Sequence, residues 1–275
     1  MPTRPAAAPA RLPVEVSGAV SRYLDAIDAA LPGFVTGLYV TGSAALGAWQ
    51  AGASDIDTLI VTARPASGGD LAHLARLHAA LPDRPCLDGI YLDEGSLAGF
   101  PADRRVTPFV VNGQFHADRP CGDLNPVLWL VLCRHGVAVR GPAVADLAIP
   151  ADSAALVTYL RDNLRTYWRP LARDIREHLR DIADDDPVEA DGVAWAVLGP
   201  ARLHYTLTHG DIVSKAEAGA YLTALLPEWA DLADRAVRWR AGEPLRFTAA
   251  DLRAAAASID AVVTDADRRL AQAES

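Results

Sequence analysis

The chain contains 275 residues, 51% of them hydrophobic, and carries a formal net charge of −9. This composition excludes a largely disordered protein, and the negative charge argues against general binding to nucleic acid, whose phosphates repel an acidic surface. The longest apolar run near the middle, residues 127–133, is too short to span a bilayer, so we expect no membrane partner.

Residues 1–12 are rich in alanine and proline, and we expect a flexible tail without the apolar segment of a signal peptide. From residue 13 onward, hydrophobic spacing and turn-forming residues predict helices that alternate with strands. Helices are expected at 13–31, from 43 to about 50, at 71–81 and at 125–134, and strands at 34–41, 56–62, 86–92, 106–111 and, at a sheet edge, 137–139. This alternation predicts an α/β domain over residues 13–150.

Strand signals nearly disappear after residue 150. A long amphipathic helix is expected at 154–180, followed by an acidic loop at 181–191. Further helices are expected at 195–209, 215–225, 229–241 and 249–273. These patterns predict a helical bundle over residues 151–275. The fold class predicted for the whole chain is therefore α/β followed by all-α.

The most informative motif combines a glycine–serine turn with two aspartates. The expected strand 34–41 ends at Gly42 and Ser43, where glycine permits close approach of a ligand and the amides of a helix start suit a phosphate. After eleven intervening residues, Asp55 and Asp57 open the next strand, and alternate residues of a strand share one face. Two carboxylates with triphosphate oxygens give the oxygen-only site that Mg²⁺ prefers. The glycine–serine turn and the aspartate pair are each common in ordinary turns, but their combination predicts a Mg²⁺–nucleotide site.

This pattern resembles the signature of the nucleotidyltransferase superfamily related to DNA polymerase β, in which Gly-Ser is followed by Asp-x-Asp. The chain is also similar to the aminoglycoside adenylyltransferases that modify streptomycin and spectinomycin, at residues 39–59, 139–143, 197–205 and 210–215. The resemblance implies an N-terminal nucleotidyltransferase domain with a mixed sheet, a helical C-terminal domain, and an active site in the cleft between them.

The resemblance also implies the reaction. It is transfer of AMP from ATP to a hydroxyl of a small polycationic molecule, foremost an aminoglycoside or aminocyclitol antibiotic, with Mg²⁺ as cofactor and pyrophosphate as the leaving group. Two alternatives stay open. One is a nucleotidyltransferase with another acceptor, such as a lincosamide, a metabolite or a protein. The other is a catalytically silent nucleotide-binding protein, against which the presence of both Asp55 and Asp57 argues.

Nucleotidyl transfer of this kind usually needs a third acid, which binds a metal or accepts the proton of the attacking hydroxyl. Asp88, on the expected strand 86–92, matches the family's catalytic glutamate by register but is one methylene shorter. Asp93 and Glu94 are rival candidates that fall nearer a loop. The alternative for Asp88 is a carboxylate at a strand edge that faces water.

The resemblance implicates four residues of the helical half. Lys215, the single lysine of the sequence, matches the lysine that contacts phosphate in the family, and Arg202 is a candidate partner or a solvated side chain. Asp191 matches, with a shift of one residue, an acid that holds a cationic drug. Trp195 falls where family members have histidine or asparagine. These matches assign Lys215 and Arg202 to the nucleotide and Asp191 and Trp195 to the acceptor.

The three cysteines, Cys86, Cys121 and Cys133, show no paired spacing. An odd number without CxxC pairs argues against a disulfide framework and favours a reducing compartment, so we expect a cytoplasmic protein. Neither cysteine nor histidine shows the spacing of a zinc site. We expect a monomer or weak dimer whose partner is a small molecule.

Overall fold

The computed structural model describes residues 12–97, 106–147, 149 and 152–273. Residues 1–11 of the expected tail lie outside the described residues. The chain divides into two units, Met1–Asp152 and Ser153–Ser275. Each unit has its own hydrophobic core and is treated by itself below.

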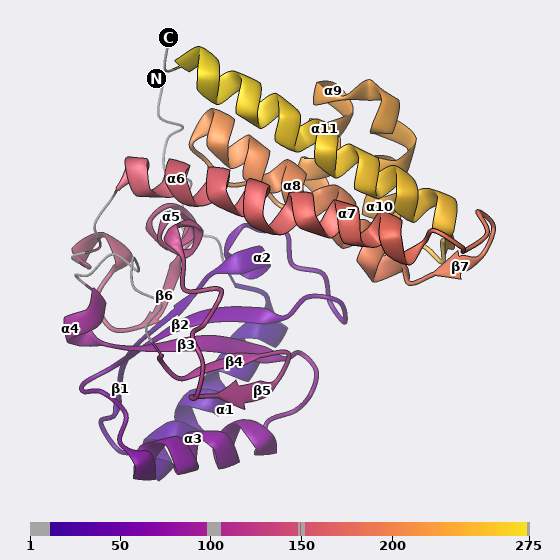
Figure 1. The fold of residues 1–275 in the computed structure, drawn as a ribbon. Coiled ribbons are helices and arrows are strands. Elements are labelled where there is room, and N and C mark those ends of the chain that lie inside the picture. Colours follow the sequence, from indigo (N-terminus) through magenta and orange to yellow (C-terminus); the bar gives the residue numbers. More distant parts are fainter. Residues whose placement is uncertain (1–11, 98–105, 148, 150–151, 274–275) are drawn as a thin grey trace. The chain divides into compact units, whose positions relative to one another are not determined.

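The first unit is built around a six-stranded mixed sheet (Figure 1). Its strands are β1 (Val35–Val40), β2 (Ile56–Thr62), β3 (Leu87–Asp93), β4 (Phe109–Val111), β5 (Gln114–His116) and β6 (Val137–Arg140). Their order across the sheet is β5-β4-β3-β2-β1-β6. Strands β2 and β3 run parallel, and every other neighbouring pair is antiparallel. The expected edge strand near residue 137 is therefore confirmed as β6.

Helices cover both faces of this sheet, which explains why most residues of its central strands β2 and β3 are buried. The helices of this unit are α1 (Val14–Ala30), α2 (Gly42–Ala45), α3 (Gly68–Ala80), α4 (Glu94–Leu97) and α5 (Pro126–His135). Alternate residues of a strand point to opposite faces. Accordingly Leu38 and Ile60 pack in the cluster that contains α1 and α3, whereas Tyr39 and Leu59 pack with Trp129 of α5.

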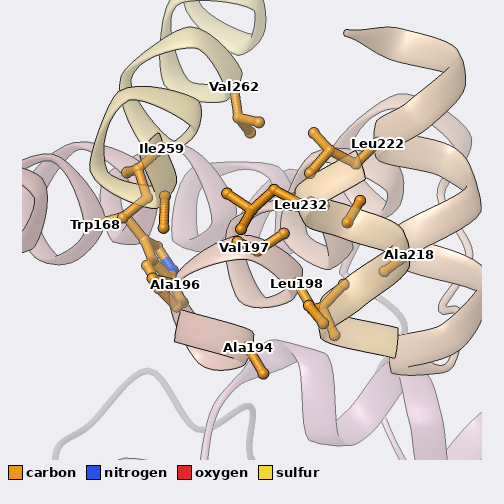
Figure 2. Packing of buried hydrophobic residues seen from close by; sticks show 14 of the residues in the cluster. Trp168, Ala194, Ala196, Val197, Leu198, Ala218, Leu222, Leu232, Ile259 and Val262 are labelled. Carbon is orange, nitrogen blue, oxygen red and sulfur yellow. The ribbon is translucent and has the colours of Figure 1, made fainter. Parts of the chain in front are cut away.

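The second unit is helical, as Figure 1 shows in its orange and yellow parts. Its helices are α6 (Ser153–Asn163), a π-helical turn η2 (Leu164–Trp168), α7 (Arg169–His178), α8 (Ala190–His209), α9 (Lys215–Leu225), α10 (Ala230–Arg240) and α11 (Ala249–Ala273). A two-residue pairing joins β7 (Pro187–Val188) to β8 (Phe247–Thr248). Figure 2 shows Val197, Leu222 and Ile259 of its core, where many alanines let the helices pack closely.

A buried polar network also links three of these helices. His204 of α8 contacts the Tyr221 hydroxyl of α9 through Nδ1 at 2.7 Å and the Asp265 carboxylate of α11 through Nε2 at 2.9 Å. Burial lowers the pKa of His204, while the negative charge of Asp265 opposes that shift. The network fixes α9, the helix that begins at Lys215, against α8.

The structure confirms the α/β half followed by a helical half, with local corrections. The expected helix 154–180 is interrupted by η2. Trp168, the last residue of η2, packs where Gly199 of α8 leaves room, since a Cβ on Gly199 would lie 2.3 Å from its ring. The expected loop 181–191 is shorter, since α8 already begins at Ala190. The helix after Gly42 ends at Ala45, and the expected strand 106–111 is reduced to β4, which β5 follows.

Among the described residues, none of the helices combines the length and the apolar character that a bilayer span requires.

Candidate active site

The glycine–serine turn and the aspartate motif are in direct contact. The Thr41 amide donates to the backbone carbonyl of Asp57 at 2.8 Å. Gly42 follows with a φ of 58°, in the left-handed region that favours glycine. A Cβ built on Gly42 would lie 1.7 Å from Asp57 Oδ2, so no other residue fits there unless the carboxylate moves. Ser43 is half-buried in α2, and its carbonyl accepts the Ala48 amide at 2.9 Å.

Asp55 and Asp57 lie on either side of a buried residue at the start of β2. Ile56 is fully buried, whereas Asp55 is half-buried and Asp57 is exposed. This alternation is what strand geometry requires when two carboxylates share the face opposite the core side chain.

The structure brings Asp88 beside this pair. Asp57 and Asp88 are register partners on the parallel strands β2 and β3, so their side chains share one face of the sheet. Asp93 is five residues further along β3, roughly 16 Å away at the usual rise of a strand. Its carboxylate accepts the Ser96 hydroxyl at 2.6 Å, next to the start of α4 at Glu94. Of the three acids considered from the sequence, only Asp88 adjoins Asp57.

The Asp88 carboxylate is held by a turn and a thiol. Its oxygens accept the backbone amides of Asn112 and Gly113 at 2.8 and 3.1 Å, and the Cys86 thiol at 3.1 Å. Burial raises the pKa of Cys86 to about 12, and the hydrogen bond to Asp88 and the charges of Asp88 and Asp55 add to the shift. The Cys86 thiol therefore stays protonated, and it lies within electrostatic range of two of the three aspartates.

Sequence reasoning missed a fourth acid near this group. Desolvation raises the pKa of Asp123, and the like charge of Asp88 raises it further. Asp123 lies in the loop that leads to α5, 35 residues beyond Asp88, and no local pattern links the two positions. The Asn112–Gly113 dipeptide was a detectable signal, because Asn-Gly between apolar residues is typical of a tight hairpin turn.

The aspartate pair has the donor chemistry that Mg²⁺ prefers. In the described part of the chain, no three or more His, Cys, Asp or Glu side chains are grouped to hold a metal by themselves. Mg²⁺ does not require such a cage, since proteins commonly bind it through one or two carboxylates together with substrate phosphates. Asp55 and Asp57 would supply that pair, and the glycine at position 42 leaves room for the Asp57 carboxylate.

In the helical unit, the structure brings Lys215 and Trp195 together. The Lys215 ammonium lies 5.8 Å from the centre of the Trp195 ring, within cation–π range. Trp195 is 44% exposed, and it packs against the buried Trp168 at a ring distance of 5.1 Å. Lys215 is the first residue of α9, directly after the Ser214 cap.

Asp191 and Arg202 lie on the same helix as Trp195. Asp191 is exposed in the first turn of α8, one turn before Trp195, not in a preceding loop as the sequence predicted. A carboxylate there also stabilises the helix start, so its position alone does not imply a ligand. Arg202 Nε donates to the carbonyl of Val213 at 2.9 Å, which ties α8 to the segment before Lys215.

Comparison with known proteins finds a matching family model for each half of the chain. Residues 20–93 match the family model of the nucleotidyltransferase domain, and residues 163–265 match that of the aminoglycoside adenylyltransferase C-terminal domain. No curated protein sequence matches the chain significantly.

Among solved structures, the chain is similar to the spectinomycin adenyltransferase of Enterococcus faecialis, determined with ATP and spectinomycin. The two share 15% sequence identity, with a TM-score of 0.61 over 91% of this chain and 98% of that one, which establishes a common fold. The two family matches support an aminoglycoside adenylyltransferase-like nucleotidyltransferase, and the similar structure shows its fold.

Proposed function

We propose that the protein transfers AMP from ATP to a hydroxyl of an aminoglycoside or aminocyclitol, in a Mg²⁺-dependent reaction that releases pyrophosphate. The observation that carries the proposal is the contact between Gly42 and Asp57. Because Gly42 has no Cβ, the Asp57 carboxylate packs directly against the turn, which places a proposed metal ligand beside the backbone that would border the phosphates.

In this proposal Asp55 and Asp57 bind the cation that accompanies the triphosphate. Mg²⁺, when bound, supplies neutralisation of phosphate charge and alignment of the reacting oxygens. Gly42 and Ser43 border the phosphates through their backbone, and Lys215 adds a compact positive charge to them. Arg202 contributes by holding the segment before Lys215.

Asp88 is the proposed proton acceptor. The acceptor hydroxyl attacks the α-phosphorus, its proton passes to the Asp88 carboxylate, and the bond to pyrophosphate breaks, so that pyrophosphate leaves with the bonding electrons. Alignment and charge neutralisation would supply most of the acceleration.

The proposed acceptor contacts are Asp191 and Trp195. An exposed carboxylate one helical turn from an exposed indole is suited to an ammonium-bearing ligand, since the first attracts positive charge and the second offers a cation–π face. The ligands of the similar structure, ATP and spectinomycin, agree with this choice of substrates.

A mass-spectrometric screen tests the proposal. Purified protein, ATP and Mg²⁺ are incubated with a panel of aminoglycosides and aminocyclitols, and with lincosamides, and products are examined for an added AMP. Asp57→Asn is the matched control. We expect the wild-type protein, but not Asp57→Asn, to form an AMP adduct on at least one aminoglycoside or aminocyclitol.

Two other outcomes of the screen would contradict the proposal. An adduct on lincosamides only, or on protein added to the mixture, would replace the proposed acceptor. ATP binding without any adduct or pyrophosphate would favour a silent nucleotide-binding protein and reject the reaction.

A further inference from the structure

The turn that holds Asp88 has a defined geometry. Strands β4 and β5 pair at Val111 and Gln114, so only Asn112 and Gly113 lie between them. Their φ angles are 51° and 73°, both left-handed. Two left-handed central residues are typical of a type I′ hairpin turn, for which Asn-Gly is the favoured sequence. The backbone amides at this tip are therefore fixed by the local sequence.

These amides are directed at a carboxylate more than twenty residues away in the sequence. Asn112 donates to Asp88 Oδ2 at 2.8 Å and Gly113 donates to Asp88 Oδ1 at 3.1 Å. The buried Cys86 thiol donates to Oδ1 as well, at 3.1 Å. The turn also packs on the thiol, since a Cβ on Gly113 would lie 3.5 Å from Cys86 Sγ.

The two carboxylate oxygens of Asp88 accept different numbers of hydrogen bonds. A carboxylate oxygen has about two lone pairs with which it accepts hydrogen bonds. Oδ1 uses both, one for Gly113 and one for Cys86, whereas Oδ2 uses one for Asn112. Within the described residues, Oδ2 therefore retains one acceptor position, on the residue that adjoins Asp57 across the sheet.

We propose that Asn112, Gly113 and Cys86 are positioning residues that fix Asp88 so that it acts through Oδ2 alone. This inference rests on the proposed function, in which Asp88 accepts the proton of the attacking hydroxyl. A glutamate side chain would carry its carboxylate about 1.5 Å further, by one carbon–carbon bond, and out of register with both amides. The length of the aspartate side chain therefore fits the two turn amides, and a longer acid at position 88 would not.

Asp88→Glu is the decisive variant. A displacement of an ångström or more at a reacting centre can slow turnover by about a hundredfold. We expect kcat for AMP transfer to fall at least tenfold while KM for ATP changes less than twofold. A glutamate variant that equals or exceeds the wild-type kcat would overturn the inference.

The cysteine gives a graded test with matched controls. Cys86→Ala removes the donor to Oδ1, whereas Cys86→Ser keeps one. We expect the alanine variant to lose several-fold in kcat and the serine variant to recover at least half of that loss. Cys133→Ala, at an exposed free cysteine on α5, controls for loss of a thiol as such. Equal rates for the alanine and serine variants would contradict a positioning role of the thiol.

Hydrogen exchange tests the same contact without any acceptor. In mass-spectrometric exchange, the peptide that spans β4, the turn and β5 should exchange at least tenfold faster at its turn amides in Asp88→Ala than in the wild type. Unchanged exchange would show that the amides do not depend on Asp88 and would overturn the inference. If the wild-type protein modifies no acceptor, the proposed function fails, whereas the exchange result still decides whether the turn holds Asp88.

Discussion

Replacing Gly42 with alanine should disable the site while leaving the fold intact. The added Cβ would lie 1.7 Å from Asp57 Oδ2, whereas real Cβ contacts essentially never fall below 3.0 Å. The carboxylate or the turn must therefore shift by more than 1 Å. A misplacement of about 1 Å at a catalytic centre can reduce turnover by roughly a hundredfold.

The backbone contributes a separate and smaller effect. Alanine in a left-handed conformation costs about 1–2 kcal/mol of stability. Gly47 allows that effect to be measured alone, because its φ is 69° and no atom lies within 4 Å of a Cβ built on it. Gly47→Ala should lose similar stability in thermal unfolding but retain most of its activity.

Three measurements on both variants separate the two effects. They are thermal unfolding, binding of ATP with Mg²⁺ by calorimetry, and the rate of AMP transfer to an acceptor from the screen. We expect both proteins to unfold a few degrees lower than the wild type, and Gly42→Ala alone to lose transfer by about a hundredfold. Equal transfer rates for the two variants would refute the argument that position 42 needs glycine to make room for the Asp57 carboxylate.

Three further predictions concern single side chains. Asp57→Asn should reduce transfer to below about 1% with an unchanged unfolding temperature, and a variant that keeps a tenth of the activity would remove Asp57 from the site. Lys215→Ala should weaken ATP binding or slow turnover at least about tenfold, roughly 1.4 kcal/mol, and unchanged ATP kinetics would remove Lys215 from the nucleotide site. Burial lowers the pKa of His78 to about 4. Because the unfolded chain binds that proton near pH 6.5, stability should fall as the pH drops from about 6.5 to 4, by about 3 kcal/mol in urea unfolding. His78→Gln should flatten this dependence and the exposed His73→Gln should not.

The sequence determined the element types and the direction of side chains within each element. Hydrophobic spacing distinguishes helices from strands because one face of each must be buried, and the period of that face differs between them. The alternation of side chains along a strand put Asp55 and Asp57 on one face. These conclusions depend on residues only a few positions apart.

Only the tertiary structure decided which distant residues meet. The choice of Asp88 over Asp93 depends on the register of two parallel strands, which is set by packing across the whole sheet and not by local pattern. The contact of Lys215 with Trp195 likewise depends on how two helices pack. Such pairings are decided by burial and hydrogen bonding summed over many contacts, to which a short stretch of sequence contributes little.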